Sequence, residues 1–167
     1  MNVQLHGMRR FVLTGKRTWS LLDEQGQSLG TLMRPRWFSN NAELVVPEGL
    51  LMLRPRKILH RSIAAFLGDV PLIEVQFPWR GGLVLVPVNS TGEELRVKRV
   101  SWFKEEWRVA DAQGVEHARI KYHFSWKHFE YEPALIAESG EPLSAMQLLT
   151  LIHALFVFQR RRTAAVS

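Results

Sequence analysis

Two stretches of this sequence carry the same tryptophan, aspartate and glycine at the same spacing. "WSLLDEQGQSLGTLMRPRW" begins at Trp19, and "WRVADAQGVEHARIKYHFSW" begins at Trp107. Each contains an Asp-x-x-Gly segment, at 23–26 and at 111–114, between apolar stretches. Asp at the first turn position accepts backbone amide hydrogen bonds, and Gly tolerates the positive φ that follows. Both stretches therefore predict β-hairpins.

A third copy of this unit lies between the other two. The segment "LIEVQFPWR" at 72–80 aligns with "RIKYHFSWK" at 119–127, which pairs Trp79 with Trp126. The three copies recur at a regular spacing, with units at about 8–50, 51–94 and 95–138, and such a period indicates a repeat architecture. Apolar and polar residues alternate within each unit, which predicts four strands per unit and about twelve strands in all. Because the tryptophans recur with this period, we interpret them as core or strand-packing residues.

The last segment, 144–161, departs from the strand pattern and predicts one helix. Ser144 and Gln147 have the spacing of a capping box. From Ala145 to Phe158 only Gln147, Thr150 and His153 interrupt the apolar residues. A helix that is apolar on all sides belongs in a protein interior, and this run is shorter than the roughly 20 residues that a bilayer requires. We expect a buried helix in which His153 is a hydrogen-bonded core residue.

Three strand units followed by a hydrophobic helix resemble the tubby-like C-terminal fold of the tubby, LURP-one-related and phospholipid-scramblase families. The resemblance rests on "WSLLDEQGQSLGTL", "WRVADAQGVEHARI" and "SAMQLLTLIHALFVF" in that order. It implies a mainly β, closed antiparallel barrel of about twelve strands that encloses the C-terminal helix. A closed sheet has no exposed edge, and so many strands leave a lumen that a helix can fill. The alternatives are a β-propeller, which needs four or more blades, and a ligand barrel with its helix outside.

Composition fits a single domain over 1–167. Hydrophobic residues make up 46% and charged residues 23%, and the chain has no cysteine, so its stability must come from packing without disulfides. The N-terminus lacks the 7 to 15 residue apolar core of a secretory signal. We therefore expect a cytoplasmic protein that associates peripherally with membranes, since a net charge of +6 favours anionic partners.

Cations near the starts of the second and third units are the candidate anion-binding residues. Strand alternation places Arg54 and Arg56 on one face of their strand, and Arg96 and Lys98 on one face of theirs. Spaced cations on a rigid face can bind phosphate groups by charge-assisted hydrogen bonds. The tubby-like resemblance likewise implies binding of anionic phospholipid through basic surface residues. The full candidate set is Arg54, Arg56, Lys57, Arg61, Arg96, Lys98 and Arg99.

These observations favour a non-enzymatic phospholipid-binding module without cofactor or metal. The common phosphate-loop, hydrolase-elbow and zinc motifs do not occur in the sequence. We interpret His117, His123 and His128 as solvent-facing side chains on strands. The alternatives are a small-molecule or lipid carrier with a cavity beside the helix, and a structural domain. Nucleic-acid binding is disfavoured because the tryptophans follow the structural period.

Overall fold

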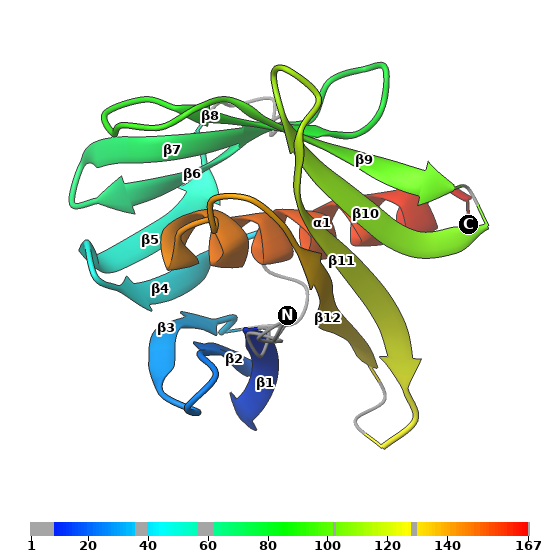
Figure 1. Cartoon of the computed structure of the whole chain (residues 1–167), viewed down its shortest axis with the longest axis horizontal. Coiled ribbons are helices and arrows are strands. Elements are labelled where there is room, and N and C mark those ends of the chain that lie inside the picture. The colour runs from blue at the N-terminus through cyan, green and yellow to red at the C-terminus, as the bar shows by residue number, and fades with distance from the viewer. Residues whose placement is uncertain (1–8, 36–39, 57–61, 102, 128–129, 167) are drawn as a thin grey trace, which may run out of the picture.

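The structure, a computed structural model, describes residues 9–35, 40–56, 62–101, 103–127 and 130–166. Its twelve strands form one antiparallel sheet in which each strand pairs with the next along the chain, and one helix follows them. The sheet curls into a nearly closed barrel around the helix (Figure 1). The elements are β1 (Arg10–Gly15), β2 (Thr18–Leu22), β3 (Ser28–Met33), β4 (Ala42–Val46), β5 (Gly49–Pro55), β6 (Ser62–Leu67), β7 (Val70–Gln76), β8 (Leu83–Pro87), β9 (Leu95–Ser101), β10 (Lys104–Asp111), β11 (Glu116–Ser125), β12 (Glu130–Glu138) and α1 (Ala145–Val166).

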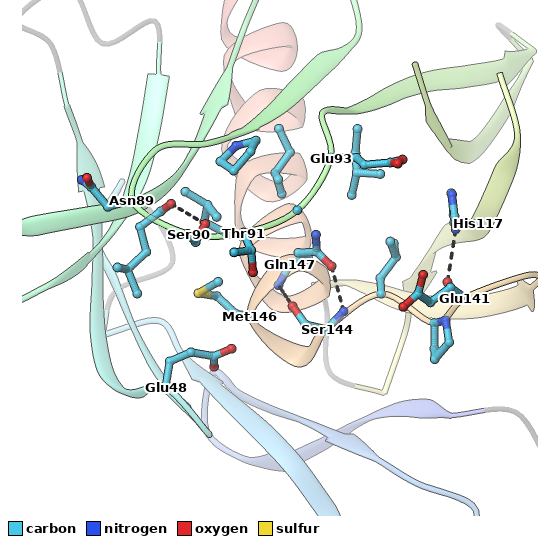
Figure 2. A pocket seen from close by; sticks show the side chains of 18 of the residues that line it. Glu48, Asn89, Ser90, Thr91, Glu93, His117, Glu141, Ser144, Met146 and Gln147 are labelled. Atoms are coloured by element: carbon cyan, nitrogen blue, oxygen red, sulfur yellow. Dashed lines mark hydrogen bonds between the residues drawn. The ribbon is translucent and has the colours of Figure 1, made fainter. Parts of the chain in front are cut away.

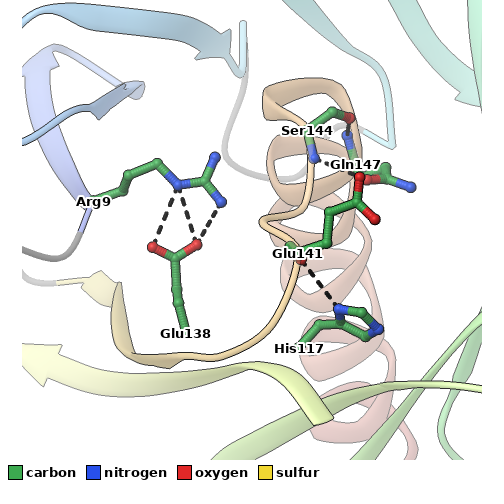
Figure 3. A network of polar contacts seen from close by, with 6 residues as sticks. All are labelled: Arg9, His117, Glu138, Glu141, Ser144 and Gln147. Carbon is green, nitrogen blue, oxygen red and sulfur yellow. Dashed lines mark hydrogen bonds and ion pairs between the residues drawn. The ribbon is translucent and has the colours of Figure 1, made fainter. Parts of the chain in front are cut away.

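The barrel closes where β1 approaches β12. These two strands are the ends of the hydrogen-bonded strand order, so the seam between them is not part of the backbone ladder that joins the other strands. Side chains bridge the seam: Arg9, just before β1, donates from Nε to Oε1 of Glu138 at 3.1 Å (Figure 3). The predicted mainly β barrel with one C-terminal helix is confirmed.

The helix α1 fills the interior of the barrel. All eight residues from Leu148 to Leu155 are 0% exposed. Eight residues make more than two helical turns, so every side of the helix is covered by the sheet. The inward side chains of all three predicted units, among them Trp19, Ile63 and Trp107, belong to the same core. The interior placement predicted for the helix is confirmed, although α1 ends at Val166, beyond the predicted boundary at 161.

Two close contacts explain how the sheet accommodates the helix. An added Cβ on Gly30 of β3 would lie 3.0 Å from Leu149 Cδ1 and 3.2 Å from Ala145 Cβ, so the absent side chain lets α1 approach the sheet. On another wall of the barrel, the Tyr122 hydroxyl donates to the Ile152 carbonyl oxygen at 3.0 Å. The fit therefore depends on both packing and a buried hydrogen bond.

The two predicted Asp-x-x-Gly turns have the same hydrogen bonds. Asp23 Oδ1 accepts from the backbone amides of Gln25 and Gln27 at 2.9 and 2.8 Å. Asp111 Oδ1 accepts from the amides two and four residues later at 2.9 and 3.0 Å. Gly26 and Gly114 have φ values of 80° and 83°. Both hairpins are confirmed, as β2–β3 and β10–β11.

The predicted units correspond to the observed strands to within a few residues. Each contains four strands, with β5 beginning at Gly49 rather than at 51. The triplication itself stays a prediction. One part of it is wrong: the periodic tryptophans are not all packed in the core. Trp19 and Trp107 are buried, but Trp79 and Trp126 are 85% and 81% exposed, because they lie in turns beyond the ends of their strands.

The antiparallel order divides the turns between two ends of the barrel. The helix begins at the end that holds the β2–β3, β4–β5, β6–β7, β8–β9 and β10–β11 turns, and it runs towards the other end (Figure 1). The turn and link segments at its starting end contain carboxylates and no lysine or arginine: Asp23, Glu24, Glu48, Asp69, Glu93, Glu94 and Glu141. We call this the acidic end.

The opposite end has the reverse composition. Its turns join β1–β2, β3–β4, β5–β6, β7–β8, β9–β10 and β11–β12, and the C-terminal half of α1 lies beside them. In the described parts of these turns there is no carboxylate, and the cations are Lys16, Arg17, Arg34, Arg56, Arg80 and Lys127. We call this the basic end. The turns at the two ends of the barrel therefore carry opposite charges, although Arg9 and Arg10 at the start of β1 also lie at the acidic end.

Candidate functional site

Three neighbouring turns at the basic end expose an aromatic side chain followed directly by a cation. Trp79 precedes Arg80 in the β7–β8 turn, Phe103 precedes Lys104 at the β9–β10 turn, and Trp126 precedes Lys127 in the β11–β12 turn. The aromatic side chains are 85%, 82% and 81% exposed, and all three cations are exposed. We call these six residues the rim.

The C-terminal half of the helix contacts residues beside two of the rim turns. Phe77, beside the β7–β8 turn, stacks on Phe158 of α1 with ring centroids 6.3 Å apart. Arg161 of α1 places its guanidinium 5.0 Å from the centre of the same Phe77 ring. Gln159 donates to Glu105 of β10 at 3.1 Å. The helix thereby adds further cations to the end of the barrel that holds the rim.

The rim residues were not among the predicted site residues. Their signal in the sequence was the aromatic–cation pair in alternate turns, together with the absence of carboxylates from those turns. Singly exposed apolar side chains are ordinary on protein surfaces. Three large aromatic side chains above 80% exposure, in successive turns at one end of a barrel, are a different case, and such exposed apolar groups are candidates for an interaction surface.

The predicted basic residues lie mainly on the outer wall of the barrel. Arg54 is exposed on β5 and stacks 4.1 Å from the centre of the Phe66 ring. Arg56, also exposed, forms an ion pair with Glu74, whose side chain is 5% exposed. Arg96 and Lys98 are exposed on β9. Lys57 and Arg61 lie outside the described residues.

These wall cations are not one contiguous cluster. Arg56 and Arg96 fall in one transverse row through Ser62, Gln76 and Val84. The three intervening strands separate them by about 19 Å at the usual strand spacing. The structure brings Arg96 and Lys98 together and holds Arg54 and Arg56 apart from them.

Arg99 differs from the other predicted residues because it is mostly buried. Its side chain is 17% exposed and forms an ion pair with Glu105. Its guanidinium lies 5.9 Å from the centre of the Trp107 ring, on the inner side of the sheet. Arg99 therefore links β9 to β10 instead of facing solvent.

A cavity of about 780 Å³ opens at the acidic end beside the start of α1 (Figure 2). The β8–β9 loop, the link from β12 to α1 and the first helical turn all contribute to its lining. Ser144 and Gln147 form the predicted capping box there: Gln147 N donates to Ser144 Oγ at 3.1 Å, and Ser144 N donates to Gln147 Oε1 at 2.8 Å. Their reciprocal hydrogen bonds hold this side of the cavity in place.

His117 connects the link between β12 and α1 to the β10–β11 hairpin through hydrogen bonds. Its Nε2 lies 3.0 Å from Asp111 Oδ2. Figure 3 shows its other contact, in which Nδ1 lies 3.1 Å from the carbonyl oxygen of Glu141. With an acceptor at each ring nitrogen, the doubly protonated imidazolium is favoured. The hydrogen bond that His117 donates to the Asp111 carboxylate raises the pKa of His117, and the same contact lowers the pKa of Asp111.

The predicted solvent-facing role is wrong for His117, whose side chain is 15% exposed. His123 fits it better: its side chain is 51% exposed, and its Nε2 lies 3.5 Å from Glu132 Oε2. His128 lies outside the described residues. Among the residues that the structure does describe, no three His, Asp or Glu side chains gather closely enough to hold a metal ion.

His153 is a buried, neutral residue within α1. Its Nε2 donates to the Asn40 carbonyl oxygen at 2.8 Å, whereas its Nδ1 has no hydrogen-bond partner in the described part of the chain. Burial, reinforced by the charge of Arg34, lowers the pKa of His153 to about 3. The expectation of a hydrogen-bonded core histidine is thus met at one of its two nitrogens.

Neither a protein-family model, a curated protein nor a solved structure matches this chain significantly. Kinship with tubby-like proteins therefore stays a prediction that rests on the residue pattern. Over the described residues, no helix combines the length and the apolar character needed to cross a membrane.

Proposed function

We propose that this protein is a non-catalytic module that docks its basic end on anionic phospholipid surfaces. The supporting observation is the rim, where Trp79, Phe103 and Trp126 are each followed by an exposed cation. Tryptophan and phenylalanine partition into the membrane interface, and neighbouring lysine and arginine side chains bind lipid phosphates. One barrel end thus presents both groups that a peripheral membrane protein requires.

The charge distribution favours one orientation of the barrel at the membrane. Cations at the basic end are attracted to an anionic surface, and carboxylates at the acidic end are repelled by it. With the rim against the headgroups, the helix axis points away from the membrane and the acidic cavity stays open to water. The wall cations Arg96 and Lys98 then contribute long-range attraction without direct contact.

Single-stranded nucleic acid is the other polyanion that aromatic and basic side chains bind. Such binding uses a groove that follows the strand and stacks successive bases. The three rim aromatics instead lie at the tips of separate turns, each two strands from the next, or about 10 Å along the sheet. This spacing suits contact with a flat surface better than continuous stacking.

Two matched triple variants test the proposal in vesicle co-sedimentation. One variant removes the rim cations by Arg80→Gln, Lys104→Gln and Lys127→Gln. The other removes three wall cations by Arg54→Gln, Arg96→Gln and Lys98→Gln. Because the net charge changes equally, any difference between the two variants reports the position of the cations and not the total charge.

At about 1 kcal/mol for each cation near the membrane, the rim variant should lose affinity for phosphatidylserine vesicles by about 100-fold. The wall variant should lose much less. A larger loss in the wall variant would favour the strand cations as the lipid site. Equal binding of the wild-type protein to neutral phosphatidylcholine, or tighter binding to an oligonucleotide than to vesicles, would refute the proposal.

A further inference from the structure

The cavity at the acidic end has the dimensions of a small-molecule site. Its volume of about 780 Å³ falls within the range of roughly 300 to 1,000 Å³ that is typical of ligand pockets. Apolar side chains contribute to its lining: Leu67 and Leu72 keep accessible surface, and the buried Ile73, Leu85, Leu95, Leu143 and Met146 lie behind them. The cavity can therefore bury the apolar part of a ligand.

The charged groups around the cavity are carboxylates. Glu48 comes from the β4–β5 turn, Glu93 from the β8–β9 loop and Glu141 from the link before α1 (Figure 2). None of the three forms an ion pair with another described residue. His117 is the one basic side chain among the described lining residues; Asp111 contacts it directly, and the charge of Glu93 also helps to raise the pKa of its imidazole. The surroundings of the cavity therefore carry more negative than positive charge.

The neutral polar groups of the cavity mostly bond within the protein. Ser90 Oγ donates to the Leu72 carbonyl and Asn89 Nδ2 to the Pro71 carbonyl, each at 2.8 Å. The start of the helix could attract an anion, but the capping box already engages the Gln147 amide with Ser144 Oγ. What remains for a ligand is the apolar part of the lining and three exposed carboxylates at separate places around the cavity.

We propose that this cavity binds a small organic cation, an alkylammonium group with an apolar body. The hydrocarbon part contacts the apolar lining, and the ammonium group is attracted by the exposed carboxylates of Glu48, Glu93 and Glu141. This site lies at the opposite end of the barrel from the rim, so its occupancy is independent of membrane docking.

Three probes of equal chain length test the charge preference of the cavity. Hexyltrimethylammonium chloride, sodium hexanoate and 1-hexanol are titrated into the full chain while backbone amide resonances are recorded. The cation should bind saturably, with the largest shifts in the β8–β9 loop and the first turn of α1. Its affinity should fall as salt rises, because the attraction is between charges near the surface. Hexanoate should bind at least tenfold more weakly.

Variants then locate the binding. Glu93→Gln or Glu141→Gln should each lower the binding affinity for the cation by about fivefold, which is the effect of one favourable exposed ion pair. Glu24→Gln is the matched control, because it removes the same charge at the same end without lining the cavity. Thr91→Trp, which partly fills the cavity, should abolish binding of the cation while circular dichroism reports an unchanged fold.

The results separate this proposal from membrane docking, because the Glu93→Gln variant should bind anionic vesicles as the wild-type protein does. Equal binding of the three probes, preference for hexanoate, an equal loss in Glu24→Gln, or no saturable cation binding at millimolar concentration would each overturn the assignment.

Discussion

The Tyr122 hydroxyl donates a hydrogen bond to the carbonyl oxygen of Ile152 at 3.0 Å, and both residues are buried. This bond links β11 to the middle of α1. Burial raises the pKa of Tyr122 well above its usual value, so the hydroxyl keeps its proton and remains a donor. The wall and the helix of the barrel are therefore connected by a polar contact within an apolar core.

Tyr122→Phe should lower the free energy of unfolding by about 1 kcal/mol, the net contribution of one buried hydrogen bond. The loss stays modest because the ring of residue 122 keeps its edge-to-face contact with Phe156, 5.3 Å away. Urea denaturation measures the change. Tyr122→Leu, which also removes the ring, should destabilise more, and a Tyr122→Phe protein as stable as the wild type would mean that the hydroxyl contributes little.

Gly30→Ala should destabilise the protein by about 1 to 3 kcal/mol through overpacking. Its new Cβ would lie 3.0 Å from both Leu149 Cδ1 and Val46 Cγ1, closer than a normal contact. Gly15→Ala is the matched control on β1, because its nearest neighbour would be Thr18 Cβ at 3.6 Å. Thermal unfolding compares the two, and a Gly30→Ala protein as stable as Gly15→Ala would contradict the close approach of helix and sheet.

His153 makes the protein sensitive to acid. Its pKa of about 3 in the fold lies below its unfolded value of 6.5, so acidification favours the unfolded state, which takes up the proton more readily. Stability from this residue is complete above pH 6.5 and is lost as pH falls towards 3, by several kcal/mol at most. His153→Gln, which can keep a donor for the Asn40 carbonyl, should flatten this dependence in urea titrations between these pH values.

His117 should give the opposite pH dependence. Its folded pKa is raised, so its contribution is complete below its unfolded value of 6.5 and disappears as pH rises through the folded pKa. The pKa of Asp111 is lowered, so its contribution is complete above 3.8 and is lost as pH falls further. The pair therefore stabilises most between these two values. The difference in unfolding free energy between wild type and His117→Gln, plotted against pH, should peak there, and a flat difference would disprove the coupling.

Local patterns in the sequence predicted the hairpins and the buried helix correctly. The Asp23 and Asp111 turns need a carboxylate and a glycine at fixed spacing, and the run from Ala145 to Phe158 can only be stable when buried. Such features depend on neighbouring residues, which the sequence displays directly.

Features that join distant segments were missed. Trp79 and Trp126 follow the repeat period, yet they fall beyond the strand ends, and their exposure depends on where β7 and β11 stop. The partners of His117 include the Glu141 carbonyl in a later segment, which strand alternation cannot reveal. The opposite charges of alternate turns can be predicted from the sequence if the strands are assumed to form a meander, because successive turns of a meander lie at opposite ends of the sheet.

The most direct test of the docking orientation uses single labelling sites at the two ends of the barrel. Because the chain has no cysteine, Pro78→Cys beside the rim and Gln25→Cys in a turn at the acidic end each introduce a unique thiol for an environment-sensitive fluorophore. Both positions are exposed. On phosphatidylserine vesicles, the label at 78 should shift to shorter wavelength and the label at 25 should not. A shift at 25, or equal shifts at both ends, would contradict docking through the basic end.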